Sequence, residues 1–209
     1  MLGIHDYGVF IVSCILLNLA PGQDTLYILG RSITGGRGIG VASALGICTG
    51  SVVHTLAATA GLSLLLAASP PAFVAVKLCG AAYLVYLGAK LLFTRAADLT
   101  GPVTVPAPGG AWRAYGQGIL TNVLNPKVAL FFLAFLPQFI LPGSAHKSLA
   151  FLALGATFIT TGTLWCLALA LLGARLRAFF VRNPSVRVMI DRITGGLFML
   201  LGARLALSR

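Results

Sequence analysis

Apolar residues run along this chain in long, nearly unbroken blocks, separated by short segments that carry most of the charged residues. A helix needs about 20 mostly apolar residues to cross the hydrocarbon core of a bilayer. Six blocks reach that length, and because backbone groups in lipid must be satisfied within their own segment, we expect helices. The predicted spans are Val9–Leu29, Ile39–Ala67, Pro71–Phe93, Ala114–Leu141, Ser148–Leu172 and Val188–Leu207.

The composition agrees with an all-α integral membrane protein. Hydrophobic residues make up 58% of the 209 residues and charged residues 9%, whereas soluble domains carry about a quarter charged residues. The net charge of +11 would suit a nucleic-acid partner, but basic readers gather their charge on one solvated face. Here Lys and Arg mostly lie between the apolar blocks, so we expect the lipid bilayer as a partner and no nucleic acid.

The four cysteines lie inside apolar blocks and form no CxxC pair. Cysteine in such a setting usually packs as a small hydrophobe. We therefore predict no metal site, and no cofactor is implied.

Lys and Arg are distributed unevenly over the predicted loops. Ten lie in the loops after spans one, three and five, beginning with Arg31 and Arg37, and three lie on the opposite side. Cytoplasmic loops carry an excess of Lys and Arg, so both termini are predicted to be non-cytoplasmic. The N-terminus lacks the basic start of a secretory signal peptide, and we interpret the first apolar block as a retained membrane helix.

The two halves of the chain resemble each other. SALGICTG from Ser43 and LALGATFI from Leu152 share Ala-Leu-Gly, and YLVYLGAKLLF from Tyr83 and LFMLLGARLAL from Leu197 share Leu-Gly-Ala before a basic residue. Three spans in each half would make the repeats inverted in the membrane, a recurring design of secondary transporters. We predict repeats at residues 1–99 and 114–209, joined by a Pro/Gly-rich linker at 100–113; the alternative is a likeness of composition alone.

Span one contains the polar interruption NLAPGQD. Pro21 lacks a backbone donor and Gly22 permits unusual dihedral angles, so the helix should unwind there. Unwound backbone at membrane depth is tolerated where protein or a water-filled cavity surrounds it. Asn18, Gln23 and Asp24 next to the break favour a substrate or proton pathway, and a simple proline kink is the alternative.

Asp24 is the only acidic residue well inside a predicted span. Such residues usually face a pathway or a partner. It could bind the ammonium group of a substrate or carry a coupled proton, and the structural alternative is a permanent ion pair with Lys77 or Lys127. Lys77, two turns into span three, either extends to the outer headgroups or faces the cavity.

Span four contains a second interruption, NVLNPKVALFF. Asn122 and Asn125 offer amide groups, Pro126 should free backbone carbonyls, and Lys127 supplies a cation. A half-helix beginning after Pro126 would present a positive dipole end to a carboxylate. Together with Asp24, this break would suit a zwitterion.

Span two adds His54, a candidate proton carrier or a hydrogen-bonded packing residue. Gly46 and Gly50 form a GxxxG motif that lets helices approach closely, either within the monomer or in a homo-oligomer.

The segments PGQDTLYILGRSITGGRGIGVASALGICTG, VKLCGAAYLVYLGAKLLF and GILTNVLNPKVALFFLAFLPQF follow one another along the chain. They resemble the LysE superfamily of amino-acid exporters, in particular its RhtB-type branch of homoserine, threonine and related efflux proteins. The resemblance implies a bacterial inner-membrane exporter of amino acids or close derivatives, with protons as the coupling ion. It assigns importance to Pro21, Gly22, Asp24, Asn125, Pro126 and Lys127. Gln23 stands where the family often has a second proline, which leaves the substrate open.

Two other classes of function compete with an exporter. A passive channel or a structural membrane subunit would show neither saturable counterflow nor dependence on a proton gradient. An enzyme is not expected, because the chain lacks HExxH and GxSxG motifs and has no paired acids within a span.

Overall fold

The computed structural model describes residues 2–68, 70–93, 109–141 and 143–207, and these are almost entirely helical. The only β-type pairing among them is an isolated bridge between Ile4 and Ile140. The elements are α1 (Tyr7–Leu19), α2 (Gln23–Ala68), α3 (Pro70–Leu92), α4 (Ala111–Val123), α5 (Pro126–Leu130), η2 (Phe131–Phe135), η3 (Leu136–Phe139), α6 (Lys147–Arg182) and α7 (Pro184–Leu207). An all-α architecture is therefore confirmed.

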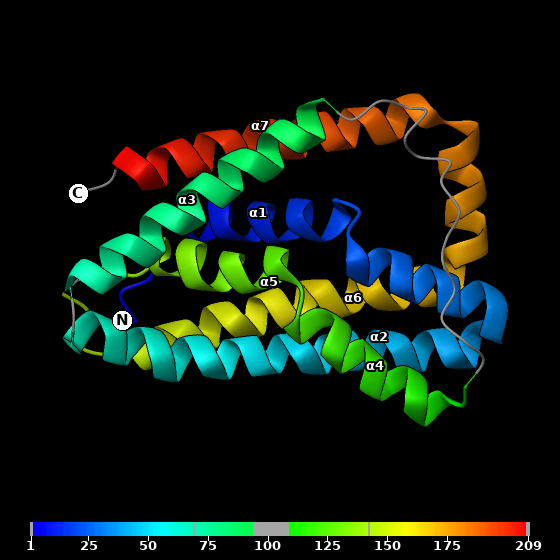
Figure 1. Ribbon diagram of the computed structural model, residues 1–209, viewed down its shortest axis with the longest axis horizontal. Coiled ribbons are helices and arrows are strands. Elements are labelled where there is room, and N and C mark those ends of the chain that lie inside the picture. The colour runs from blue at the N-terminus through cyan, green and yellow to red at the C-terminus, as the bar shows by residue number, and fades with distance from the viewer. Residues whose placement is uncertain (1, 69, 94–108, 142, 208–209) are drawn as a thin grey trace.

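The first two predicted spans are divided differently from the expectation. The chain leaves α1 at Leu19, and α2 then continues for 46 residues with a kink at Gly36. Gly36 has φ 80° and ψ 176°, a conformation that residues with a Cβ rarely adopt. The chain reverses at this kink, so the two arms of α2 form a hairpin (Figure 1). The loop predicted between these spans is thus mostly helical.

The fourth predicted span is a bent pair of helices. α4 ends at Val123, α5 begins at Pro126, and the two axes differ by 48°. After five residues α5 widens into the π-helical turn η2 and then tightens into the 3-10 turn η3. The predicted linker at 100–113 lies mostly outside the described residues, and α4 already begins at Ala111.

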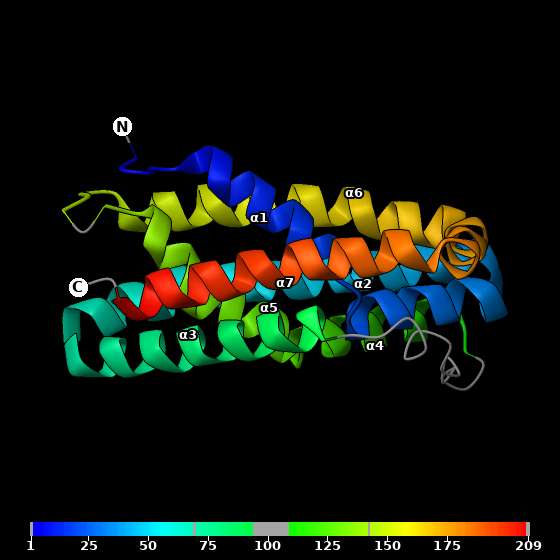
Figure 2. The same ribbon diagram turned by 90° about the horizontal axis from the view of Figure 1, so that it is seen from above.

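Most helices lie roughly along one long axis, and the last part of α6 (orange) runs across it, as Figures 1 and 2 both show. α2 packs along α4 and α6, and α3 packs along α7. Aromatic rings fill the core between α1, η2, η3 and α6: the ring centroids of Phe131 and Phe135 are 4.7 Å apart, and those of Phe131 and Phe158 are 5.2 Å apart. This core holds the bent fourth span against the first.

The GxxxG motif of α2 packs against α4 of the same chain. A side chain on Gly46 would collide with the backbone of Tyr115 in α4, and a Cβ on Gly50 would lie 2.7 Å from that of Asn122. Gly118 faces back from α4, where a Cβ would lie 2.7 Å from the carbonyl oxygen of Ser43. Small residues on both helices therefore bring α2 and α4 into backbone contact.

α3 and α7 make a similar glycine-mediated contact. A Cβ on Gly88 would lie 2.7 Å from the carbonyl oxygen of Gly195, and a Cβ on Gly202 would lie 2.9 Å from that of Ala81. The later residue of α3 meets the earlier residue of α7, so the two helices are antiparallel.

Two described helical segments are long and apolar enough to cross a membrane alone, Gln23–Gly61 and Lys147–Gly173. The bent pair Ala111–Val123 and Pro126–Phe139 would be a third crossing if it is one span. These lengths agree with a membrane protein, and the count of six spans stays a prediction.

The N-terminal segment and the end of α7 lie at the same end of the molecule (Figure 2). The Asp6 carboxylate, just before α1, lies 3.2 Å from the His5 ring and 3.4 Å from the Arg204 guanidinium. The hydrogen bond from His5 lowers the pKa of Asp6 below its ordinary value, and the Arg204 charge acts in the same direction.

Candidate functional site

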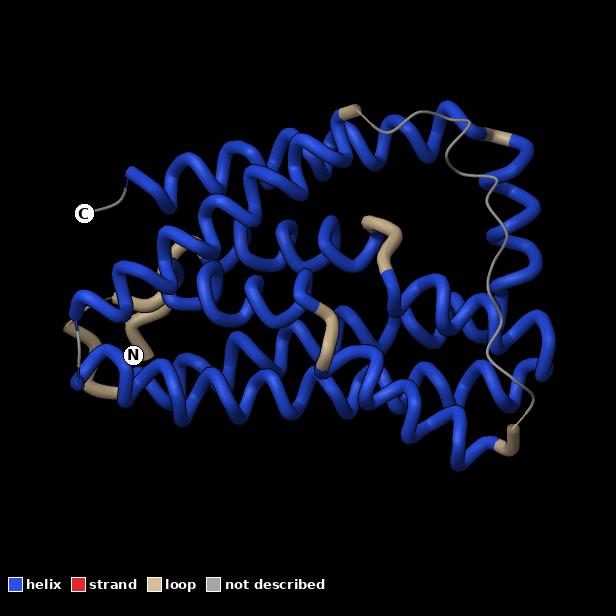
Figure 3. Tube along the Cα trace, viewed as in Figure 1, coloured by secondary structure: helices blue, strands red, loops and turns tan. Residues whose placement is uncertain are grey.

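The two helix interruptions meet near the middle of the molecule, where Figure 3 shows them as short loops. Pro21 has no N–H, so the carbonyl of Leu17 loses its helical partner. Lys127 replaces it: its Nζ donates to the Leu17 carbonyl at 3.1 Å and to the Ala20 carbonyl at 2.9 Å. A cation is thus placed at the negative end of α1, where it also interacts favourably with the helix dipole.

The second interruption is repaired in the same way. Pro126 removes the donor that the Asn122 carbonyl would have used. That oxygen accepts from the Asn125 N–H at 3.0 Å and lies 3.0 Å from the His54 ring Nε2. A carbonyl only accepts, so Nε2 is the donor. The Asn125 side chain accepts from the Lys127 backbone N–H at 3.0 Å and caps α5. His54 is therefore hydrogen-bonded, which fits the packing role among its two predicted alternatives.

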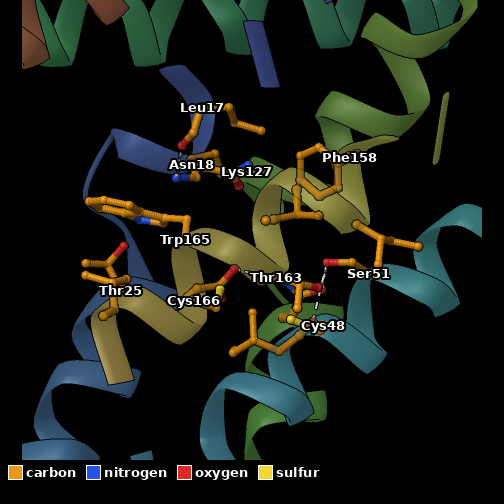
Figure 4. Close-up of a pocket in the computed structure, with 17 residues that line it drawn as sticks. Leu17, Asn18, Thr25, Cys48, Ser51, Lys127, Phe158, Thr163, Trp165 and Cys166 are labelled. Atoms are coloured by element: carbon orange, nitrogen blue, oxygen red, sulfur yellow. Dashed lines mark hydrogen bonds between the residues drawn. The ribbon is translucent and has the colours of Figure 1, made fainter. Parts of the chain in front are cut away.

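A cavity lies between the two interruptions and is closed on one side by α6 (Figure 4). Its empty volume is about 480 Å³, including the part that opens outward. Its polar lining includes Asn18, Asp24, Ser51, Asn122, Lys127 and Thr163.

Only one of the two Asp24 carboxylate oxygens has a hydrogen-bond partner within the described structure. Oδ2 accepts a hydrogen bond of 2.8 Å from the Asn122 side chain. Oδ1 is buried and has no hydrogen-bond partner within the described structure. Lys127 makes no ion pair with this carboxylate within the described residues, because its ammonium bonds the carbonyls of Leu17 and Ala20 instead. The alternative pair with Lys77 stays a prediction. An unpaired buried carboxylate oxygen is costly, and here it borders a cavity.

Lys127 has one donor to spare. An ammonium group has three donors, and the carbonyls of Leu17 and Ala20 take two. Lys127 lines the same cavity as Asp24, so one positive and one negative side chain share this space without touching. The two side chains therefore offer one group of each charge to a molecule that carries both.

The remaining candidate residues lie around this cavity or away from it. A Cβ on Gly22 would lie 3.1 Å from Lys127 Nζ, so glycine leaves room for the ammonium. Pro21 lies in the first break and Pro126 opens α5 after the second. Of the ten candidates, four are in the lining, namely Asn18, Asp24, Asn122 and Lys127, and the other six are not. Gln23 is exposed at the start of α2, and Lys77 is half-buried on α3.

Helix α6 contributes a wall of the cavity that none of the predicted site residues included. Phe158, Thr163, Trp165 and Cys166 all line the cavity from this helix. A signal was present in the sequence: TTGTLW places four small or hydroxyl residues and a tryptophan inside a predicted span, whereas tryptophan is enriched at the membrane interfaces.

Cys48 on α2 and Cys166 on α6 both line this cavity, in which Figure 4 labels both. No group of three or more metal-ligating side chains occurs within the described part of the chain.

Arg31 was predicted to lie in the loop after span one, and this placement is wrong. It lies inside α2, only 2% of its surface is exposed, and its guanidinium carbon lies 5.7 Å from the centre of the Tyr27 ring. Its guanidinium also donates to the Gln117 side chain of α4, and Tyr27 Oη donates to the Ala114 carbonyl at 2.6 Å. The sequence pattern missed this because the short kink at Gly36 keeps Arg31 within the helical hairpin.

Comparison with known proteins gives full-length relatives. The chain is 33% identical to the homoserine/homoserine lactone efflux protein of Salmonella typhimurium, over 96% of this chain and 95% of the relative. It is 30% identical to the leucine efflux protein of the same organism, over 98% and 96% of the two chains. An uncharacterized membrane protein of Pseudomonas aeruginosa is 32% identical, over 98% and 96%. No solved structure matches significantly.

The sequence profile of the LysE type translocators matches residues 15–209. This range contains both helix interruptions and every described residue that lines the cavity. Translocators move molecules across membranes, so the protein is a transporter and not an enzyme. The chain belongs to the LysE type translocator family.

Proposed function

We propose that this protein exports amino acids or close derivatives across the bacterial cytoplasmic membrane in exchange for protons. The observation that carries the proposal is the Asp24 carboxylate, with one buried oxygen unpaired in a cavity between two interrupted helices. Charged residues at membrane depth usually mark a substrate or ion pathway.

The relatives' substrates support an ammonium site. The names of those efflux proteins mention homoserine, homoserine lactone and leucine. Each of these compounds carries an amino group that is protonated below its pKa. Only the lactone lacks a free carboxylate. Asp24 Oδ1 is the anionic acceptor that the shared group requires, and the spare donor of Lys127 suits the carboxylate that the amino acids have.

Proton coupling follows from the chemistry of a single carboxylate. Asp24 can hold a substrate ammonium when ionised or a proton when neutral, and each form excludes the other. If the carboxylate releases the amino acid on one side and binds a proton before it returns, the two fluxes are opposite. This mechanism gives Asp24 both of the roles that the sequence left open.

We propose that six spans form two inverted repeats and that the site lies at the interface between the two repeats. The contacts of α3 with α7 support it: the shared Leu-Gly-Ala segments pair Gly88 with Gly202 at an offset of 114 residues, and the same offset relates Ala81 to Gly195. The contact of Gly88 with Gly195 therefore becomes, under exchange of the halves, the contact of Gly202 with Ala81. A pseudo-two-fold axis produces such reciprocal contacts.

The proposed orientation has both termini outside the cytoplasm. The contact between Asp6 and Arg204 supports a common side for both ends of the chain. The kink at Gly36 and the start of α4 lie at the opposite end of the molecule (Figure 1) and are followed by Arg37 and Arg113, as cytoplasmic segments would be.

The test is efflux from proteoliposomes with an imposed pH gradient, over neutral and basic amino acids and homoserine. Antiport predicts saturable, substrate-dependent proton movement and counterflow. The Asp24→Asn variant should lose both, while Asp6→Asn, a matched change outside the cavity, should keep them. Unsaturable flux without proton movement would indicate a channel and overturn the proposal.

A further inference from the structure

The indole N–H of Trp165 is a second unsatisfied polar group in the cavity. Nε1 is buried and has no hydrogen-bond partner within the described structure, and Trp165 lines the same space as Asp24. Buried tryptophan N–H groups usually find an acceptor, and leaving a donor unpaired is costly. A bound molecule with an acceptor would remove that cost.

The unpaired groups are of opposite kinds. Asp24 Oδ1 lacks a donor, whereas Trp165 Nε1 lacks an acceptor. Lys127 adds one further donor beyond the two that α1 uses. A ligand that satisfies all three presents a cationic donor at one point and an anionic acceptor at another, as the backbone groups of a free α-amino acid do.

The rest of the lining restricts the side chain of that ligand. Asp24 is the only acidic residue among the described residues that line the cavity, and Lys127 is the only basic one. A basic side chain would find no second carboxylate and would be repelled by Lys127, and an acidic side chain would add a second anion beside Asp24. Apolar surface comes from Leu17, Ile47, Val128, Phe158, Ile159 and Leu169.

We propose that the cavity takes a neutral α-amino acid with an apolar side chain and that the Trp165 N–H binds its carboxylate, which makes Trp165 a determinant of substrate specificity. This inference rests on the proposed function, because it assumes that the cavity holds the transported amino acid. It adds a residue on α6, opposite the two interrupted helices, and a side-chain class.

The first experiment leaves Trp165 in place. The chain has two tryptophans, and Trp112 is 83% exposed at the start of α4, so Trp112→Phe makes Trp165 the only indole. Saturating leucine should change the emission of this variant. Leucinamide, which keeps the ammonium but lacks the carboxylate, should produce a smaller change at equal occupancy. No change with leucine, in a variant that still transports it, would overturn the proposal.

The second experiment removes the donor and keeps the ring. In counterflow with purified protein in proteoliposomes, Trp165→Phe should raise the half-saturating leucine concentration about tenfold or more, as expected for one lost hydrogen bond to a charged group. The half-saturating concentration of leucinamide should change less than about threefold. Equal changes for both ligands would mean that the indole only packs, and this would overturn the assignment.

Competition by other amino acids tests the side-chain class. Leucine and similar neutral amino acids should compete at concentrations at least about tenfold lower than lysine or glutamate. Equal competition by lysine would overturn the class while leaving amino-acid export intact. Absence of counterflow with every amino acid in the wild-type protein would instead overturn the proposed function together with this inference.

Discussion

The ammonium nitrogen of Lys127 lies 2.9 Å from the carbonyl oxygen of Ala20, the C-cap residue directly after α1. The lysine follows a proline in the fourth predicted span, and the carbonyl precedes a proline in the first. One interrupted helix therefore supplies the donor that the other has lost, and the two breaks stabilise each other.

Replacing Lys127 with Met should destabilise the protein and stop export. The carbonyls of Leu17 and Ala20 would lose a donor, at a cost of about 1 to 3 kcal/mol for each buried group left unpaired. Thermal unfolding in detergent and efflux from proteoliposomes measure the two effects. Lys147→Met, at the first residue of α6, is the control and should change neither strongly. An unaltered melting temperature for Lys127→Met would contradict the capping role.

Asn122→Ala should impair transport through Asp24. The Asn122 amide donates to Asp24 Oδ2 at 2.8 Å, and a hydrogen bond to a charged group contributes about 1.5 to 3 kcal/mol. We expect the ratio of maximal rate to half-saturating substrate concentration to fall about 10- to 100-fold. Thr121→Ala is the matched control, because the hydrogen bond of the Thr121 hydroxyl in the described structure goes to the Gln117 carbonyl of its own helix. Equal losses in both variants would point to a general defect of α4.

Gly88→Ala and Gly202→Ala should destabilise the protein to similar extents. Each new Cβ would lie within 3 Å of a carbonyl oxygen on the facing helix, and overpacking costs about 1 to 3 kcal/mol. Gly196→Ala in α7 meets nothing within 4 Å and should stabilise by about 0.5 to 1 kcal/mol. Melting temperatures of the three variants would test this order. A large loss at only one of the first two glycines would argue against the reciprocal contact.

Oxidation of Cys48 and Cys166 should cross-link α2 to α6 and inhibit transport. Both cysteines line the cavity, from two helices that pack along each other, so a disulfide between them would bridge the cavity. A mild disulfide-forming oxidant should block efflux, and a thiol reductant should restore it. Cys48→Ser should resist the oxidant, whereas Cys79→Ser, an exposed position on α3, should remain sensitive. Persistent inhibition in Cys48→Ser would exclude this pair as the cause.

The helix interruptions were accessible from the sequence because their cause is local. Pro21 and Pro126 lack the backbone donor that a continuous helix needs, and the structure ends a helix just before each of them. The partners that repair the breaks were not accessible, because His54 lies 68 residues from Asn122 and Lys127 lies 107 residues from Ala20. Spacing along the chain carries no information about such distant pairs.

The residues that the sequence placed incorrectly show the same limit. Arg31 follows an apolar block, which suggested a loop, yet its side chain is buried. The tight turn at Gly36 folds the two arms of α2 together, and the Gln117 side chain accepts a hydrogen bond from the guanidinium. The GxxxG of α2 left the identity of its partner helix open, and only the packing shows that it is α4.

The sequence alone determined that this chain is helical, apolar enough for a membrane, and broken at two prolines, because these properties depend on composition and on neighbouring backbone groups. The tertiary structure decided that Asp24 keeps one oxygen unpaired, that Lys127 serves α1 rather than Asp24, and that Trp165 completes the cavity wall. Those outcomes depend on which side chains compete for each donor and acceptor once distant helices pack, and that competition exists only in the folded protein.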